Sequence, residues 1–277
     1  MAEITTGGVR FHVQRLPARR LTGSADRPTH PPTVVFVHGL LIDNMSSFYY
    51  TLANPAARAG ADVILYDLRG HGNTERPPTG YSVDASVRDL TALLDAMGVT
   101  RPVHLVGNSF GGAVALALTM AHPDRVASLL LIDGVVLAED WIEEMTRILA
   151  MDGPELLTAL RGKGFQLREH EADRFYAFAS AFLNGTTLAA DIATVQPFPS
   201  ASLQSVACPV VAAYGENSDI IHHAYTLKNL LPDCALTVVP NCSHFLITEA
   251  PGVLRELLLR QLTSDAVTER LPVGKVR

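Results

Sequence analysis

The sequence has few cysteines and no excess of positive charge. Its 277 residues include only three cysteines, an odd count with no CxxC pair. This excludes a disulfide-built scaffold and a CxxC metal or redox motif, and it suits a reducing compartment. Acidic residues outnumber basic ones by 28 to 22, for a formal charge of −6. Because nucleic-acid binding requires concentrated positive charge, we expect no nucleic-acid partner.

Long hydrophobic runs are also missing. No stretch approaches the roughly 18 apolar residues of a membrane span. The first six residues have neither the basic start nor the apolar run of a signal peptide. We therefore expect a cytoplasmic protein without a membrane partner. Hydrophobic residues still make up 48% of the chain, enough for the core of one large α/β domain that carries an insertion.

Short apolar runs alternate with amphipathic segments through most of the chain. Residues 8–16 have the alternating pattern of a half-exposed strand, and 82–97 carry a helical stripe closed by a glycine. Continuous apolar runs, typical of buried parallel strands, lie at 33–37, 63–66, 102–106, 126–132, 209–214 and 236–240. This alternation predicts a mostly parallel central sheet with helices on both faces. In such sheets the chemistry gathers at the carboxyl ends of the strands.

Residues 136–203 interrupt the alternation. They hold four helical patterns (141–151, 155–161, 169–183 and 187–195) and no convincing strand. We interpret 136–203 as an inserted helical cap over the strand ends. Residues 1–135 and 204–277 then form the α/β core.

The sequence Gly107-Asn108-Ser109-Phe110-Gly111 lies between an apolar strand pattern and an Ala- and Leu-rich helix pattern. A Gly-x-Ser-x-Gly in this place is typical of a nucleophile elbow, where a strained tight turn exposes the serine. Side chains two residues before or after that serine would collide with the neighbouring strand and helix. The motif therefore predicts Ser109 as a catalytic nucleophile, with the Phe110 amide directed from a helix N-terminus at a developing oxyanion.

A serine hydroxyl needs a base, and the base needs an orienting acid. His244 is the best base among ten histidines, because it lies in a short loop between the last strand and the last helix. Asp219 follows the preceding strand and is our candidate acid. Glu216 in the same loop and Asp133 at the end of the strand after the elbow remain alternatives.

These motifs together resemble the α/β-hydrolase superfamily in its capped form. The resemblance covers residues 33–262 and rests on His38-Gly39, the Asp-x-Arg-Gly-His-Gly sequence at 67–72, the elbow, and the acid and histidine loops. It implies an α/β-hydrolase fold, a Ser109–His244–Asp219 triad, and an oxyanion hole formed by the amides of Leu40 and Phe110. We further expect Leu41 and Phe245 to contact the substrate.

The superfamily supports many reactions, so the activity is a hypothesis. The apolar loop after His38-Gly39 and the Leu- and Phe-bearing cap favour an ester, thioester or lactone of an apolar small molecule. Asn108 is similar to the elbow residue of carbon–carbon bond hydrolases of vinylogous diketones, but their Gly- and Ser-rich oxyanion loop is replaced here. Acyl transfer or cyclisation onto a substrate hydroxyl, and a non-catalytic ligand-binding role, are further alternatives.

We expect no cofactor and no metal. The sequence Gly70-His71-Gly72 lacks the third glycine of a dinucleotide fingerprint. The adjacent His222 and His223 would face different directions on a helix and make a poor metal pair. His38 and His71 are expected to shape loops through hydrogen bonds rather than to exchange protons with substrate.

Overall fold

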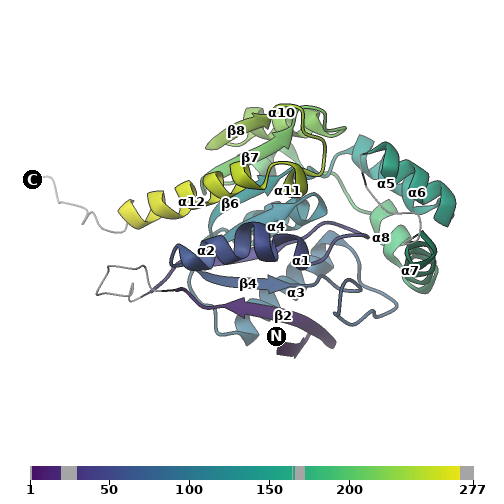
Figure 1. Cartoon of the computed structure of the whole chain (residues 1–277), viewed down its shortest axis with the longest axis horizontal. Coiled ribbons are helices and arrows are strands. Elements are labelled where there is room, and N and C mark those ends of the chain that lie inside the picture. The colour runs from purple at the N-terminus through teal and green to yellow at the C-terminus, as the bar shows by residue number, and fades with distance from the viewer. Residues whose placement is uncertain (1, 20–29, 164, 166–171, 269–277) are drawn as a thin grey trace, which may run out of the picture.

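The computed structural model describes residues 2–19, 30–163, 165 and 172–268, with side chains to 263. An eight-stranded sheet lies at its centre, and helices cover both faces (Figure 1). The strands are β1 (Ala2–Thr6), β2 (Val9–Leu16), β3 (Thr33–Val37), β4 (Asp62–Tyr66), β5 (Val103–Asn108), β6 (Val126–Ile132), β7 (Val210–Gly215) and β8 (Cys234–Val239). The longer helices of the α/β part are α3 (Val83–Ala96), α4 (Phe110–Ala121), α10 (Ile221–Leu230) and α12 (Pro251–Thr268).

Shorter helical segments complete this part of the chain. They are α1 (Ser46–Phe48), the π-helical turn η1 (Tyr49–Ala53), α2 (Asn54–Arg58), the 3₁₀ turn η2 (Pro123–Arg125) and α11 (Leu246–Glu249). Among the described residues, none of the helices has both the length and the apolar character that crossing a bilayer demands.

The strand order is β1-β2-β4-β3-β5-β6-β7-β8. The six strands from β4 to β8 in this order pair in parallel, and β1 and β2 form an antiparallel edge. The fold is the α/β-hydrolase fold that the sequence resemblance implied. Its parallel strands are buried on both faces, which explains why their sequences are continuous apolar runs.

The side chains of each central strand supply two hydrophobic cores in alternation. On β3, Val35 and Val37 point into the larger core with α3, α4 and α10, while Val34 and Phe36 point into the core under α1, α2 and α12. Alternate residues of a strand face opposite sides of the sheet, so a single apolar run serves both layers.

The first strand was not predicted. β1 pairs with β2 through the two-residue turn Gly7-Gly8, and both glycines have positive φ (57° and 77°). Such a turn matches the twist of a hairpin and requires residues that tolerate positive φ. The segment 2–6 is short and mostly exposed, so it lacks the apolar alternation from which a strand can be predicted.

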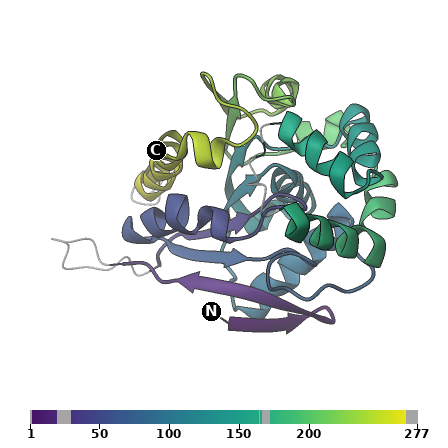
Figure 2. The same ribbon diagram turned by 45° about the vertical axis from the view of Figure 1, so that its right-hand side comes forward.

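In the described part of the connection between β6 and β7, the chain forms five helices. They are α5 (Glu139–Leu149), α6 (Gly153–Gly162), α7 (Ala172–Gly185), α8 (Leu188–Ala193) and α9 (Ser200–Gln204). In both views, α5 to α8 lie together beyond the end of the sheet toward which β4 points (Figures 1 and 2). The predicted helix at 169–183 corresponds to α7, and 169–171 lie outside the described residues. The division into a core and a cap stays a prediction.

Candidate active site

Ser109 lies in the turn between β5 and α4, with φ 51° and ψ −119°. This is a sparsely populated conformation for a residue with a side chain. A Cβ on Gly107 would lie 2.5 Å from the Gly111 carbonyl oxygen, and one on Gly111 would lie 2.0 Å from the Val37 carbonyl oxygen. The two glycines of the motif are therefore required by close backbone approach, as the elbow prediction stated.

His244 lies in the loop between β8 and α11, next to the elbow. Its Nε2 is 2.9 Å from Ser109 Oγ, within hydrogen-bonding distance. This is the geometry in which an imidazole accepts the proton of a nucleophilic serine. The two residues are 135 positions apart in sequence, and the parallel sheet brings them together because both follow carboxyl ends of strands.

The three candidate acids have different partners. Asp133 is fully buried, and its Oδ1 lies 3.6 Å from His244 Nδ1. Asp219 instead pairs with the ammonium of Lys163, and no atom of its carboxylate comes within ion-pair distance of His244. Glu216 accepts a hydrogen bond from the backbone amide of Asn241. The structure thus does not bring the predicted Asp219 to His244. The carboxylate that faces Nδ1 is that of Asp133, the residue after β6.

Asp133 is held in place by the β7 loop. Its backbone has φ 44°, its Oδ1 accepts a hydrogen bond from Ser218 Oγ at 2.6 Å, and its Oδ2 accepts one from the Gly215 amide at 3.3 Å. At 3.6 Å the contact with His244 is slightly longer than a hydrogen bond. Catalytic hydrogen bonds are often long without substrate and shorten in the reacting complex.

The charge state of His244 follows from these neighbours. Burial by itself lowers the pKa of the ring, whereas Asp133, followed by Asp219, raises it, and the net result is a raised pKa. Both carboxylates favour the imidazolium form, which is the form that a general base adopts after taking the serine proton.

In the loop after β3, the backbone amides on either side of Leu40 have hydrogen-bond acceptors. The Gly39 amide donates to Asp43 Oδ2 at 2.8 Å, and the Leu41 amide donates to His71 Nε2 at 2.9 Å. Among the described residues, the Leu40 amide between them has no acceptor. The Phe110 amide lies in the first turn of α4, where N–H groups lack intrahelical partners. Both predicted oxyanion amides therefore belong to residues that line the same cavity as Ser109.

Two buried histidines shape these loops. His71 Nδ1 donates to the Arg69 carbonyl at 2.8 Å, so its Nε2 is free to accept from Leu41. Burial, and then His38, lower the pKa of His71 to about 3, which keeps the ring neutral. His38 Nε2 accepts the Leu68 amide in the same way. The predicted loop-shaping role of both histidines is confirmed by these hydrogen bonds.

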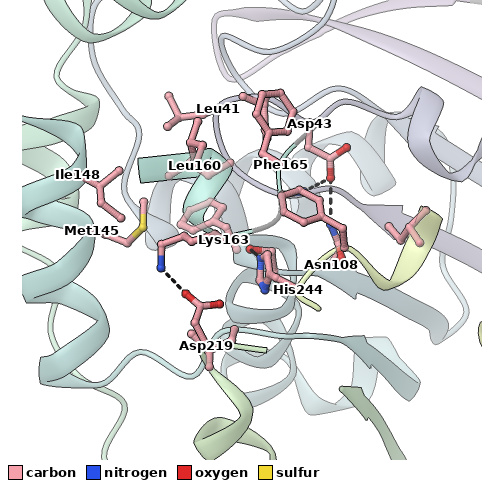
Figure 3. Close-up of a pocket in the computed structure, with 18 of the residues that line it drawn as sticks. Leu41, Asp43, Asn108, Met145, Ile148, Leu160, Lys163, Phe165, Asp219 and His244 are labelled. Carbon is pink, nitrogen blue, oxygen red and sulfur yellow. Dashed lines mark hydrogen bonds and ion pairs between the residues drawn. The ribbon is translucent and has the colours of Figure 1, made fainter. Parts of the chain in front are cut away.

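Asp43 is a site residue that the sequence reasoning missed. Besides the Gly39 amide, its Oδ2 accepts a hydrogen bond from Asn108 Nδ2 at 3.0 Å, and its Oδ1 accepts one from Ser47 Oγ (Figure 3). One carboxylate thus joins the loop after β3 to Asn108, the residue before Ser109. A carboxylate in an otherwise apolar loop was the available signal, because even a partly buried charge requires hydrogen-bond donors.

A cavity of about 430 Å³ opens over Ser109 and His244 (Figure 3). This volume is in the range of small-molecule sites. Leu41 and Phe245, the predicted substrate contacts, both line it. Most of its wall is apolar and comes from the β3 loop, α5, α6 and the His244 loop; these apolar residues are Leu40, Leu41, Ile42, Phe110, Trp141, Met145, Ile148, Leu160, Phe165, Ile220, Phe245 and Ile247.

One group of residues has the composition of a metal site. Potential ligand atoms of Asp140, His222 and His223 lie within 4.8 Å of one another. The two ring centroids lie 4.4 Å apart, although His222 is exposed and His223 is buried. However, His223 Nδ1 accepts the Val136 amide, which places the ring proton on Nε2 and leaves no lone pair for a metal. His222 Nε2 pairs with Asp140 at 2.8 Å. We therefore assign these residues no metal.

Comparisons with known proteins agree with this fold. A family model described as alpha/beta hydrolase fold matches residues 32–198. A 2-hydroxy-6-oxo-6-(2'-aminophenyl)hexa-2,4-dienoic acid hydrolase from Metapseudomonas resinovorans is 25% identical over 233 residues, 79% of each chain. The sn-1-specific diacylglycerol lipase ABHD11 of Mus musculus is 26% identical over 79% of this chain and 77% of its own.

A solved structure is also similar over nearly the whole chain. Est816, described as an N-acyl homoserine lactone degrading enzyme, superimposes with a TM-score of 0.67 at 25% identity, covering 93% of this chain and 98% of its own. The chain belongs to the alpha/beta hydrolase fold family. It is an enzyme of that family, whose relatives are hydrolases acting on small molecules.

Proposed function

We propose that the protein is a serine hydrolase that cleaves an ester, thioester or lactone of a largely apolar small molecule. The observation that carries this proposal is the 2.9 Å contact between His244 Nε2 and Ser109 Oγ at an apolar cavity of about 430 Å³. A serine paired with an imidazole is an acyl-transfer nucleophile. The names of the lipase and lactone-degrading relatives support the same reaction class.

In the proposed mechanism, Ser109 Oγ attacks the substrate carbonyl carbon while His244 Nε2 takes its proton. The amides of Leu40 and Phe110 donate hydrogen bonds to the oxyanion. His244 then protonates the leaving oxygen or sulfur, and the acyl group stays on Ser109. A water molecule, deprotonated by His244, attacks the acyl-enzyme and releases the acid.

We assign the orienting acid to Asp133 rather than Asp219. Asp133 faces His244 Nδ1 at 3.6 Å and is fixed by Ser218 and the Gly215 amide. The hydrogen bond that it would form in the reacting complex selects the tautomer with the proton on Nδ1, so that Nε2 is free to accept the serine proton. Asp219 lies in the cavity wall, and its negative charge helps to raise the pKa of His244.

We also propose that helices α5 to α9 act as a cap on the α/β core. Helix α5 contributes Trp141, Met145 and Ile148 to the cavity, and α6 contributes Leu160. The cavity is therefore built between the elbow on one side and these helices on the other. In this arrangement the helices between β6 and β7 determine which substrates fit.

Active-site labelling tests the proposal directly. The wild type, Ser109→Ala, and the exposed-serine control Ser205→Ala are each treated with a fluorophosphonate and offered medium-chain p-nitrophenyl esters and matched thioesters. We expect labelling of Ser109 and ester turnover in the wild type and in Ser205→Ala, and neither in Ser109→Ala. Equal turnover in all three proteins would refute a serine mechanism.

Carbon–carbon bond hydrolysis is a second candidate, favoured by the relative from Metapseudomonas resinovorans. The same serine and histidine would serve that reaction. Offering a vinylogous diketone acid beside the ester series distinguishes the two, because a carbon–carbon hydrolase would cleave the diketone in preference to the esters.

A further inference from the structure

The cavity that holds Ser109 and His244 has an acidic lining. Among the described residues that line it, four carry carboxylates that are not part of the proposed triad (Asp43, Glu144, Asp219 and Glu249), and Lys163 carries the one ammonium. The described lining thus has three more negative than positive charges. In a cavity with apolar walls, such an excess of negative charge repels anionic ligands strongly, because the surrounding dielectric constant is low.

The ammonium of Lys163 is already neutralised. Its Nζ donates to Glu144 Oε1 at 2.7 Å. It also donates to Asp219 Oδ2 (Figure 3). The three side chains come from separate elements: Glu144 from α5, Lys163 from the end of α6 and Asp219 from the loop after β7. They form one polar patch in the otherwise apolar wall, which we call the Lys163 patch (Glu144, Lys163 and Asp219).

By formal charge, the Lys163 patch holds two carboxylates and one ammonium. Burial lowers the pKa of Lys163, but the two carboxylates more than offset this, and its pKa is raised. Burial raises the pKa of Asp219, but Lys163 more than offsets this, and its pKa is lowered. The patch therefore carries one net negative charge and offers no uncompensated cation to an anionic substrate.

Hydrogen-bonding capacity remains on the patch. An ammonium has three N–H donors, and two are used by the carboxylates. Each carboxylate also has a second oxygen. A neutral group that both accepts and donates, such as a carboxamide, matches this set. A carboxylate would meet the third N–H but would be repelled by its two acidic partners.

We propose that the cavity selects uncharged acyl compounds that carry a carboxamide-like polar group for the Lys163 patch and excludes substrates that carry a carboxylate there. This inference rests on the proposed function and narrows its substrate class. It separates this chain from the dienoic acid hydrolase relative, whose named substrate is an acid.

Binding to the Ser109→Ala protein tests the inference without requiring turnover. The probes are ethyl esters of one medium-chain acid whose far carbon carries a methyl, a carboxamide or a carboxylate, and their Kd values are measured by calorimetry. A second set carries the same three groups on the alcohol side. In the set whose polar group reaches the Lys163 patch, we expect the carboxamide ester to bind at least tenfold more tightly than the matching carboxylate ester. The reason is that each like charge in a low-dielectric site weakens binding by roughly a factor of ten.

Variants that remove single charges test whether the Lys163 patch causes the preference for the carboxamide over the carboxylate. In the Ser109→Ala background, Glu144→Gln and Asp219→Asn should each reduce the carboxamide preference several-fold, and Lys163→Met should increase it. Glu143→Gln is the matched control, because Glu143 is the exposed neighbour of Glu144 on α5 and does not line the cavity. It should leave the preference unchanged.

Three results would overturn the inference: equal binding of the carboxylate and the carboxamide, binding of neither, or equal effects of Glu143→Gln and Glu144→Gln. Turnover by the protein with Ser109 intact is measured in parallel. If the protein with Ser109 intact turns over no ester while the Ser109→Ala protein still prefers the carboxamide, the proposed hydrolase reaction is refuted and the charge selection stands.

Discussion

At the scale of single residues, the acid that orients His244 is the assignment on which sequence and structure differ. Asp133 and Asp219 both follow strands at the same edge of the sheet, but only Asp133 faces Nδ1, and Asp219 pairs with Lys163. The geometric assignment can be tested because each aspartate has an isosteric asparagine variant.

We expect Asp133→Asn to lower kcat by roughly 10³- to 10⁴-fold, because an amide stabilises the wrong imidazole tautomer and cannot stabilise the imidazolium. Asp219→Asn should lower kcat by less than about tenfold, since it removes only a distant charge. Both are measured with a p-nitrophenyl ester, and circular dichroism verifies folding. The reverse ranking of the two variants would return the role of triad acid to Asp219.

The pH profile depends on the same residues. A general base must be neutral, so kcat/KM should fall as the pH drops through the pKa of His244. That pKa is raised from its ordinary 6.5, because the carboxylates of Asp133 and Asp219 outweigh burial. We therefore expect the acid limb to have its midpoint above 6.5. Asp219→Asn should move the midpoint to lower pH, which a pH series of kcat/KM measures. A midpoint below 6.5 would contradict the electrostatics described here.

The raised pKa of His244 also affects the stability of the folded protein. A folded-state pKa above the unfolded value means that folding favours the charged ring. This contribution is complete below the ordinary value of 6.5 and is lost as the pH rises through the folded-state value.

At the scale of elements, the β5–α4 turn is determined by close packing of backbone. Ser109 adopts φ 51°, and its carbonyl accepts hydrogen bonds from the Gly112 and Val135 amides, both at 2.9 Å. Neighbouring backbone occupies the space where side chains on the flanking glycines would lie. The turn therefore has little freedom to relax around a substitution.

Gly111→Ala should accordingly destabilise the protein by about 3 kcal/mol, because its Cβ would lie 2.0 Å from the Val37 carbonyl oxygen. Gly185→Ala is the control, since Gly185 ends α7 and a Cβ there meets no atom within 4 Å. Urea unfolding measures both free energies. Similar stability of the two variants would show that the elbow relaxes more easily than its contacts indicate.

At the scale of the whole molecule, Phe182 on α7 joins the helices between β6 and β7 to the rest of the chain. Its ring is fully buried and lies 4.9 Å from that of His71 and 5.4 Å from that of Tyr81, centroid to centroid. Since His71 accepts a hydrogen bond from the Leu41 amide, this contact also supports the loop after β3.

Phe182→Ala should lower the free energy of unfolding by about 3 to 5 kcal/mol, the usual cost of deleting a buried aromatic ring. Tyr225→Ala, which removes an aromatic ring that is 53% exposed, should change it by less than about 0.5 kcal/mol. Chemical denaturation compares the two. A loss below about 1 kcal/mol for Phe182→Ala would mean that the helices between β6 and β7 are not coupled to the fold through this ring.

Most of the parallel sheet was predictable from the sequence alone, because strands buried on both faces must be apolar throughout. The elbow was predictable as well, since a strained turn in close contact with backbone requires glycine on both sides of the serine. The edge strand β1 was not, because an exposed strand carries no such constraint.

The sequence by itself thus determined the fold class, the glycine-flanked turn at Ser109, and the loops that meet at the carboxyl edge of the sheet. Only the tertiary structure decided which side chains in those loops face one another: Asp133 toward His244, Asp219 toward Lys163, and Asp43 toward Asn108. Spacing along a chain places a residue in a loop, but the direction of its side chain depends on backbone angles and on the partners available across the fold. Those partners come from segments distant in sequence, so charge pairing within the cavity was set when the sheet and the helices came together.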